Sequence, residues 1–157
     1  MIIIDTASIH HSLRAIGKKL DYANYISYLS KQHSDTNITV LADKHATIFL
    51  KYLNKIPDIK IHEKEAYKKK ITKTNKVWYL SFAVDIALLT HSFYATREKI
   101  IIVSTDVEIL PILETFPTEI TLYGIGTPKV LRDINNYIDI PESFLLESIK
   151  KDTNVAE

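Results

Sequence analysis

The sequence lacks cysteine altogether, and its 157 residues include only three glycines and one tryptophan. The absence of cysteine excludes disulfide bonds, thiolate metal sites and cysteine nucleophiles. It agrees with a reducing compartment, so we expect a cytoplasmic protein. A strong charge of either sign is also missing, because the formal net charge is +1. A surface that binds nucleic acid must therefore come from local clusters of basic residues.

The sequence also lacks a long uninterrupted apolar run. Its first residues, MIII, meet Asp5 at once, without the basic and apolar regions of a secretory signal. Residues 77–96 carry Asp85 as their only formal charge, but serine, threonine and histidine residues interrupt the apolar ones. A central acid costs ~2.5–3.5 kcal/mol in a membrane-spanning helix. We therefore expect a buried helix here and no membrane partner.

Apolar runs alternate with amphipathic segments along the chain. Short runs of β-branched and apolar residues predict strands at residues 1–4, 37–42, 59–62, 99–104, 119–125 and 137–140. Apolar residues at helical spacing predict helices at residues 8–19, from 21 onward, at 45–53, 77–96 and 107–115, from 128 and from 141 onward. This alternation indicates an α/β fold, a three-layer α/β/α sandwich with a mainly parallel central sheet.

No internal repeat or linker divides the sequence. We expect one domain at residues 1–141, which is long enough to bury a core, followed by a C-terminal helix and tail at residues 142–157. The sequence leaves the oligomeric state open, and a homodimer is compatible with it.

Acidic residues follow two of the predicted strands. Asp5 comes directly after III, and Asp106 and Glu108 come after IIIVS. Ligands bind at the carboxyl ends of the strands in open parallel sheets, so neighbouring strands would bring these acids into one crevice. Asp85 is a further candidate, because an ionised acid within an apolar helix is costly without a compensating charge.

Carboxylates that converge in one cleft repel one another and tolerate this best around a divalent cation. Oxygen ligands suit Mg²⁺ or Mn²⁺, and the chemistry that follows is metal-assisted phosphodiester hydrolysis. Structural roles compete with this interpretation. Asp5 could cap the following helix, Asp106 and Glu108 could favour a helix N-terminus, and Asp85 could pair with a Lys or Arg.

Four short motifs, in this order, resemble those of the NYN domains, a branch of the PIN-like nucleases. They are IIIDTAS at 2–8, VDIALL at 84–89, IVSTDVE at 102–108 and LRDINNYIDI at 131–140. The resemblance covers most of the chain and implies a PIN-like fold and a Mg²⁺- or Mn²⁺-dependent ribonuclease, an endonuclease. By position, it implies that the catalytic metal-site acids are Asp5, Asp85, Asp106 and Glu108. It gives supporting roles to Ser8 and Ser104.

The sequence departs from the family pattern at two positions. Ser8 stands where the family usually has asparagine, and Glu108 where it usually has aspartate. Glutamate keeps the charge, whereas serine loses the two donors of the amide. A catalytically inactive RNA-binding or protein-interaction module on the same fold is therefore the alternative. A nucleotide-binding or phosphoryl-transfer protein ranks last, because the sequence contains no phosphate-binding loop.

A polar and basic segment at residues 63–76, which we expect to be a loop or a mobile helix tip, precedes the predicted helix that carries Asp85. Phosphate contacts from its lysines would give sequence-independent affinity for RNA, and its tyrosine could stack on an unpaired base. A solvated loop is the competing interpretation. The predicted RNA-binding residues are Lys64, Tyr67, Lys68, Lys69, Lys70, Lys73 and Lys76.

Overall fold

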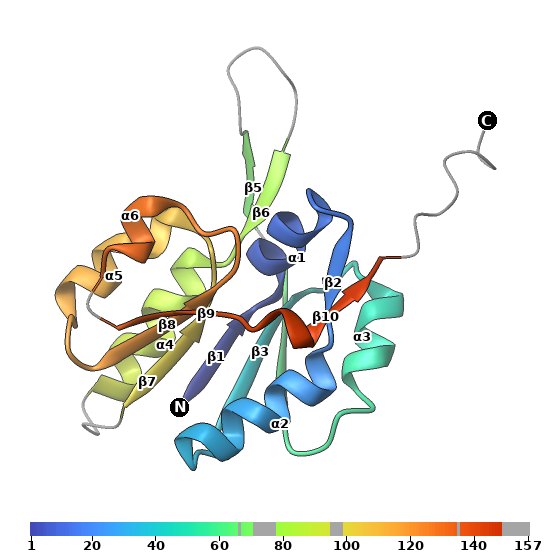
Figure 1. Ribbon diagram of the computed structural model, residues 1–157, viewed down its shortest axis with the longest axis horizontal. Coiled ribbons are helices and arrows are strands. Elements are labelled where there is room, and N and C mark those ends of the chain that lie inside the picture. Colours follow the sequence, from blue (N-terminus) through green and yellow to red (C-terminus); the bar gives the residue numbers. More distant parts are fainter. Residues whose placement is uncertain (66, 71–77, 95–98, 135, 149–157) are drawn as a thin grey trace.

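The computed structural model describes residues 1–65, 67–70, 78–94, 99–134 and 136–148. Six parallel strands form its central sheet in the spatial order β4-β3-β1-β7-β8-β9 (Figure 1). In chain order these strands are β1 (Ile2–Asp5), β3 (Ile38–Asp43), β4 (Lys60–Lys64), β7 (Ile100–Val103), β8 (Ile120–Gly124) and β9 (Tyr137–Asp139).

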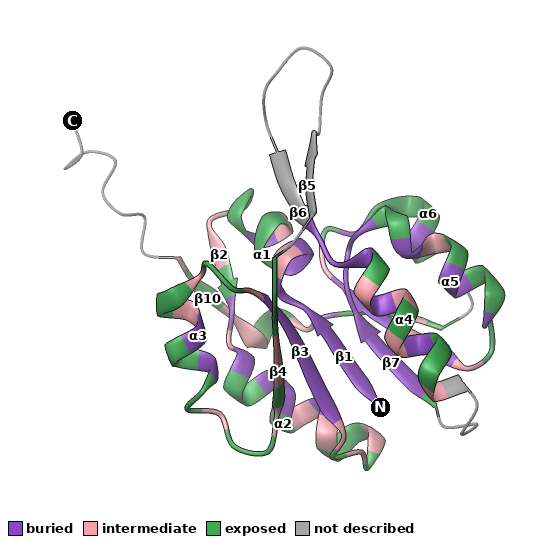
Figure 2. Ribbon diagram, turned by 180° about the vertical axis from the view of Figure 1, so that it is seen from behind, coloured by how far each residue is buried: buried purple, intermediate pink, exposed green. Residues whose placement is uncertain are grey.

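Helices cover both faces of this sheet, so the predicted three-layer α/β/α sandwich is confirmed (Figures 1 and 2). The helices of one face are α1 (Thr6–Arg14), α2 (Tyr22–His33) and α3 (Thr47–Leu53). The helices of the other face are α4 (Ala83–Tyr94), α5 (Leu110–Thr115) and α6 (Lys129–Arg132).

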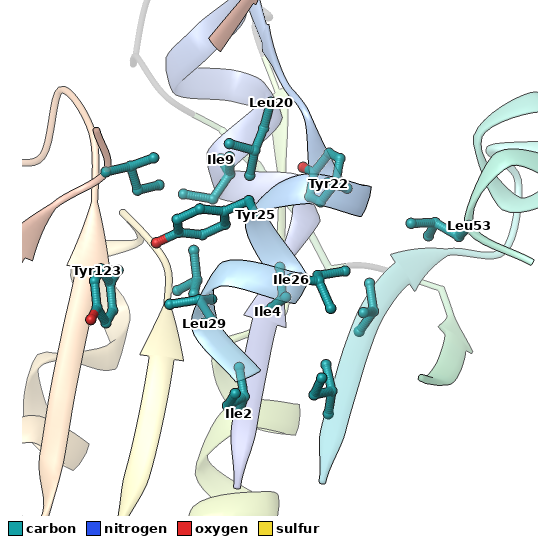
Figure 3. Close-up of a cluster of buried hydrophobic side chains, with 14 of the residues drawn as sticks. Ile2, Ile4, Ile9, Leu20, Tyr22, Tyr25, Ile26, Leu29, Leu53 and Tyr123 are labelled. Atoms are coloured by element: carbon teal, nitrogen blue, oxygen red, sulfur yellow. The ribbon is translucent and has the colours of Figure 1, made fainter. Parts of the chain in front are cut away.

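Strand β1 shows why the sheet needs a layer on each side. Its residues are all buried, and successive side chains of a strand point to opposite faces. Ile2 and Ile4 belong to the core under α2, whereas Ile3 belongs to the core under α4. Figure 3 shows Tyr25 and Leu29 of α2 over the first of these faces. Burial on both faces explains why the central strands are continuous apolar runs.

The strand order contains a switch point beside β1. The chain leaves β1 towards β3 on one side, and it later returns to pair β7 on the other side. In open parallel sheets, such a reversal leaves a crevice at the carboxyl ends of the two diverging strands. This crevice lies between β1, which ends at Asp5, and β7, which ends one residue before Ser104.

Two small antiparallel pairs accompany the main sheet. Strand β2 (Lys18–Leu20) pairs with β10 (Leu145–Glu147), and β5 (Tyr67–Lys70) pairs with β6 (Trp78–Ser81). Figure 1 shows β5 and β6 beyond the carboxyl end of the central sheet, near α1.

The prediction of one helix over residues 77–96 is wrong at its start. Residues Trp78–Ser81 form β6, and α4 begins only at Ala83. Pairing with β5 explains the difference, because aromatic residues such as Trp78 and Tyr79 favour strands when a partner strand is present. The same pairing corrects the expectation of a loop or helix tip over residues 63–76, at Tyr67–Lys70.

The predicted C-terminal helix from residue 141 is also wrong within the described residues. A short 3₁₀ helix, η2 (Glu142–Phe144), leads into β10, which pairs with β2. Phe144 and Leu145 pack against the core under α2, which holds this segment to the domain in an extended form. Residues 149–157 of the predicted tail lie outside the described residues.

Two further helix predictions differ at their ends. Helix α1 stops at Arg14 rather than residue 19, because Gly17 takes a φ of +69° and turns the chain into β2. The helix predicted at residues 107–115 is divided into a 3₁₀ turn, η1 (Val107–Ile109), and α5, with Pro111 in the first turn of α5. In the part of the chain that the structure describes, no helix has the length and apolar character needed to cross a membrane.

Candidate functional site

Asp5 is the buried acid at the carboxyl end of β1. Its side chain is 0% exposed and caps α1, where the backbone nitrogen of Ser8 donates to Oδ1 over 3.1 Å. The hydroxyl of Ser104 donates to the other oxygen, Oδ2, over 2.8 Å. The carboxylate is therefore held on both oxygens by groups from two elements, α1 and the segment that follows β7.

Ser104 joins Asp5 to the second buried acid, Asp106. The hydroxyl oxygen that donates to Asp5 also accepts a hydrogen bond from the backbone nitrogen of Asp106 over 3.2 Å. It lies 3.1 Å from the hydroxyl of Ser8 as well. The predicted residues Asp5, Ser8, Ser104 and Asp106 thus form one connected network at the switch point of the sheet.

Asp106 is fixed from two further sides. Its Oδ1 accepts from the backbone nitrogen of Glu108 over 3.0 Å, which makes it the cap of η1. Its Oδ2 accepts from the hydroxyl of Ser81, the last residue of β6. The sequence prediction missed Ser81, because it placed this residue inside a helix. The sequence signal that could have identified it is a serine just before the start of a helix. The hydroxyl oxygen of Ser81 accepts a hydrogen bond from the backbone nitrogen of Ala83 over 3.3 Å.

Burial dominates the electrostatics of the pair. Desolvation raises the pKa of Asp5 from 3.8 to about 6, although hydrogen bonds from Ser8 and Ser104 lower it. The negative charge of Asp106 adds to the rise. Burial and the charge of Asp106 thus raise the pKa of Asp5, and the neutral donors Ser8 and Ser104 lower it. At neutral pH, Asp5 is a costly buried charge that a cation would stabilise.

A pocket of about 420 Å³ opens beside this network. It lies between α1, the segment after β7, and the turn from β8 to α6. Ser8, Ser12, Thr105 and Asp106 line one part of it. The sequence prediction missed Ser12 and Thr105, whose hydroxyl oxygens lie 2.7 Å apart. Only the packing of α1 against the end of β7 brings these two residues together.

The two other predicted acids have different environments. Asp85 is half-buried in the first turn of α4, and Glu108 is exposed in η1. Helix α4 contacts η1, so the two residues come from neighbouring elements. Within the described ranges, however, no group of three or more acidic or histidine side chains lies close enough together to hold a metal ion. The structure joins Asp5 and Asp106 but does not gather all four acids.

The structure therefore fits a cation only in part. The backbone nitrogen of Ser8 and the hydroxyl of Ser104 bind different oxygens of Asp5, and a carboxylate has about four acceptor sites in all. Asp106 lines the pocket, and Asp5 lies behind it at 0% exposure. Both acids also cap helices, as the structural interpretation predicts. Capping and cation binding use different lone pairs, so one role does not preclude the other.

The predicted RNA-binding residues lie on β4 and β5 where they are described. Lys64 is exposed at the end of β4, and residues Tyr67–Lys70 form β5. Lys73 and Lys76 lie outside the described residues. Strand β6, the partner of β5, contacts α1 and ends at Ser81, which binds Asp106. The backbone of this strand pair is therefore tied directly to the acidic network.

No protein-family model and no curated protein matches this chain. Among solved structures, the chain is similar to the crystal structure of a protein of unknown function from Vibrio parahaemolyticus, with a TM-score of 0.67. The sequences are 18% identical, and the match covers 92% of this chain and 94% of the other. This likeness shows a shared fold over nearly the whole length of both chains.

Proposed function

We propose that this chain is a metal-dependent ribonuclease of the NYN type that hydrolyses phosphodiester bonds within RNA. The observation that carries the proposal is the network in which Ser104 joins Asp5 to Asp106. It lies at the switch point of a parallel sheet, where ligands bind in this class of fold. The four motifs that resemble those of the NYN domains suggest the reaction class.

Asp5 and Asp106 would hold a Mg²⁺ or Mn²⁺ ion, with Asp85 and Glu108 at the adjoining ends of α4 and η1. A bound ion of this kind neutralises charge on a phosphate and lowers the pKa of a water molecule. The residues of the chain hold the acids in place. Ser104 and the nitrogen of Ser8 fix Asp5, and Ser81 and the nitrogen of Glu108 fix Asp106. Such supporting bonds limit the reorganisation that binding requires.

Strands β5 and β6, called the basic strand pair from here on, supply the proposed contact with the RNA backbone. Lys68, Lys69 and Lys70 follow one another on β5, whose partner β6 ends at the acidic network. Lysines bind phosphates without regard to sequence. The proposal therefore assigns affinity to this strand pair and chemistry to the acids. A cytoplasmic location, where RNA is abundant, belongs to the same proposal.

The test is cleavage of an end-labelled single-stranded RNA by the purified chain in Mn²⁺ and in EDTA. We expect cleavage at internal positions in Mn²⁺ only, and a loss of at least a hundredfold in Asp106→Asn. Asp58→Asn is the matched control, because Asp58 is an exposed acid just before the edge strand β4, at the amino end of the sheet and away from the network. Its φ of +61° suits asparagine. Equal cleavage by wild type and Asp106→Asn would reject the proposal.

A second function is favoured by one specific observation. The described residues contain no group of three acids or histidines that could hold a metal, and both buried acids cap helices. A catalytically inactive RNA-binding or protein-interaction module would have this arrangement. RNA binding without any cleavage, at saturating Mn²⁺, would identify the chain as such a module.

A further inference from the structure

The hydroxyl groups at the pocket have a fixed direction of hydrogen bonding. The hydroxyl of Thr105 donates to the backbone carbonyl of Ser8 over 3.1 Å, because a carbonyl can only accept. Thr105 has one hydroxyl proton, which this bond uses. Ser12 must therefore be the donor in its 2.7 Å contact with Thr105. The oxygen of Ser12 keeps unused lone pairs and has no proton left to donate to a ligand.

The hydroxyl of Ser8 likewise uses its proton within the protein. Ser104 donates its proton to Asp5, so in the 3.1 Å contact between the two serine hydroxyls Ser8 is the donor. The oxygen of Ser8 also accepts from the backbone nitrogen of Thr105 over 3.0 Å. Ser8 and Ser12 line the same pocket as the carboxylate of Asp106. Ser8, Ser12 and Asp106 therefore present hydrogen-bond acceptors to the pocket, which His11 also lines, and these acceptors suit a ligand that donates.

The pocket also has apolar lining residues. Ile16 and Val107 line it and are 58% and 43% exposed. Pro128 has no N–H to donate, and Gly126 adds no side chain. A ligand that matches these residues has a hydroxyl donor on one edge and C–H groups on its face. The ribose of an RNA chain, with its 2′-hydroxyl, has this distribution of groups.

We propose that this pocket is a ribose subsite and that Ser12 Oγ accepts a hydrogen bond from a ribose 2′-hydroxyl. The identity of the ligand as RNA rests on the proposed function. The 2′-hydroxyl is the group that distinguishes RNA from DNA, and DNA would leave the oxygen of Ser12 without its donor. The subsite lies against Asp106, so the ribose would sit beside the phosphate on which the acids act.

The test compares two oligonucleotides that differ only in the 2′-hydroxyl. Binding of a fluorescent ten-residue oligouridine RNA and of its deoxyuridine counterpart is measured in EDTA, where no cleavage occurs. We expect wild type to prefer the RNA. In Ser12→Ala, affinity for the RNA should fall about fivefold, as for one neutral hydrogen bond, and affinity for the DNA should not change. Alanine suits this half-buried helical position, so folding should be retained.

Ser92→Ala is the matched control. Ser92 is also a helical serine, on α4, where its hydroxyl donates to the carbonyl of Leu88 over 2.9 Å. This variant should keep the full preference for RNA. Competition with free uridine distinguishes a subsite for RNA chains from a site for nucleosides. If the pocket is a subsite for chains, displacing the fluorescent RNA should need a far higher concentration of uridine than of unlabelled oligonucleotide.

Each outcome bears on the inference. No RNA binding, equal binding of both oligonucleotides by wild type, or an unchanged preference in Ser12→Ala would overturn it. Cleavage in Mn²⁺ is scored separately. Cleavage of RNA with an unaltered preference in Ser12→Ala would reject the ribose subsite and leave the ribonuclease standing. A preference that depends on Ser12, without cleavage, would keep the subsite on an inactive RNA-binding module.

Discussion

Ser81 and Asp106 are 25 residues apart in the sequence, and the hydroxyl of Ser81 donates a hydrogen bond to the carboxylate of Asp106. Ser81 ends β6, and Asp106 caps η1. The bond connects the basic strand pair to the acidic network across the carboxyl end of the sheet. It therefore relates two regions that the sequence presents as separate features.

Replacing Ser81 by alanine should weaken both the fold and the site. Ser81 is buried, and hydrogen bonds to charged groups contribute about 1.5–3 kcal/mol. We expect the free energy of unfolding, measured by urea denaturation, to fall by about this amount. Cleavage of RNA should fall as well, because Asp106 loses one of its supports. Ser92→Ala, a change at an exposed serine, should leave both quantities unchanged. An unaltered unfolding free energy in Ser81→Ala would contradict the described bond.

The pKa of Asp5 predicts a pH dependence of stability. Because this pKa is raised from 3.8 to about 6, the folded state holds the proton more tightly than the unfolded state. The contribution of Asp5 to stability is therefore full below about pH 4 and is lost as the pH rises through 6. The resulting loss in the free energy of unfolding is at most about 3 kcal/mol.

Asp5→Asn should remove this dependence. Its unfolding free energy relative to wild type should rise between pH 4 and pH 7, and at pH 7.5 the variant should be at least as stable as wild type without metal. Urea denaturation of both proteins across this range checks the difference. Asp58→Asn, a change at an exposed acid outside the network, is the control. If the unfolding free energy of Asp5→Asn relative to wild type falls between pH 4 and pH 7.5, the fold stabilises Asp5 as an anion and the prediction is wrong.

The central part of this architecture follows from the sequence. Continuous β-branched runs such as IIIV at 100–103 predict strands buried on both faces, and acids after two of these runs predict where the crevice lies. The residues that complete the network were not predictable in this way. Ser12, Ser81 and Thr105 carry no motif, and they meet only because α1 and β6 pack at the end of β7. Strand β5 was not predicted, because a run of lysines is typical of a solvated loop.

The basic strand pair gives a prediction about salt. If Lys68, Lys69 and Lys70 contact phosphates, replacing all three by alanine should weaken binding to single-stranded RNA. The slope of log affinity against log salt concentration should shrink by about 0.7 for each lost contact. Cleavage at saturating RNA should persist, because the proposed lysine contacts would bind the ground state, whereas the acids would act on the transition state. An unchanged slope, measured by fluorescence anisotropy, would return these lysines to a solvated role.

Calorimetric titration of the chain with Mn²⁺ at pH 7.5 tests the proposed metal site at Asp5 and Asp106 most directly. We expect one or two sites in wild type, their loss in Asp106→Asn and their retention in the control variant Asp58→Asn. Equal binding of Mn²⁺ by wild type and Asp106→Asn would contradict this expectation, because the buried acids would then be helix caps and not ligands of a metal ion.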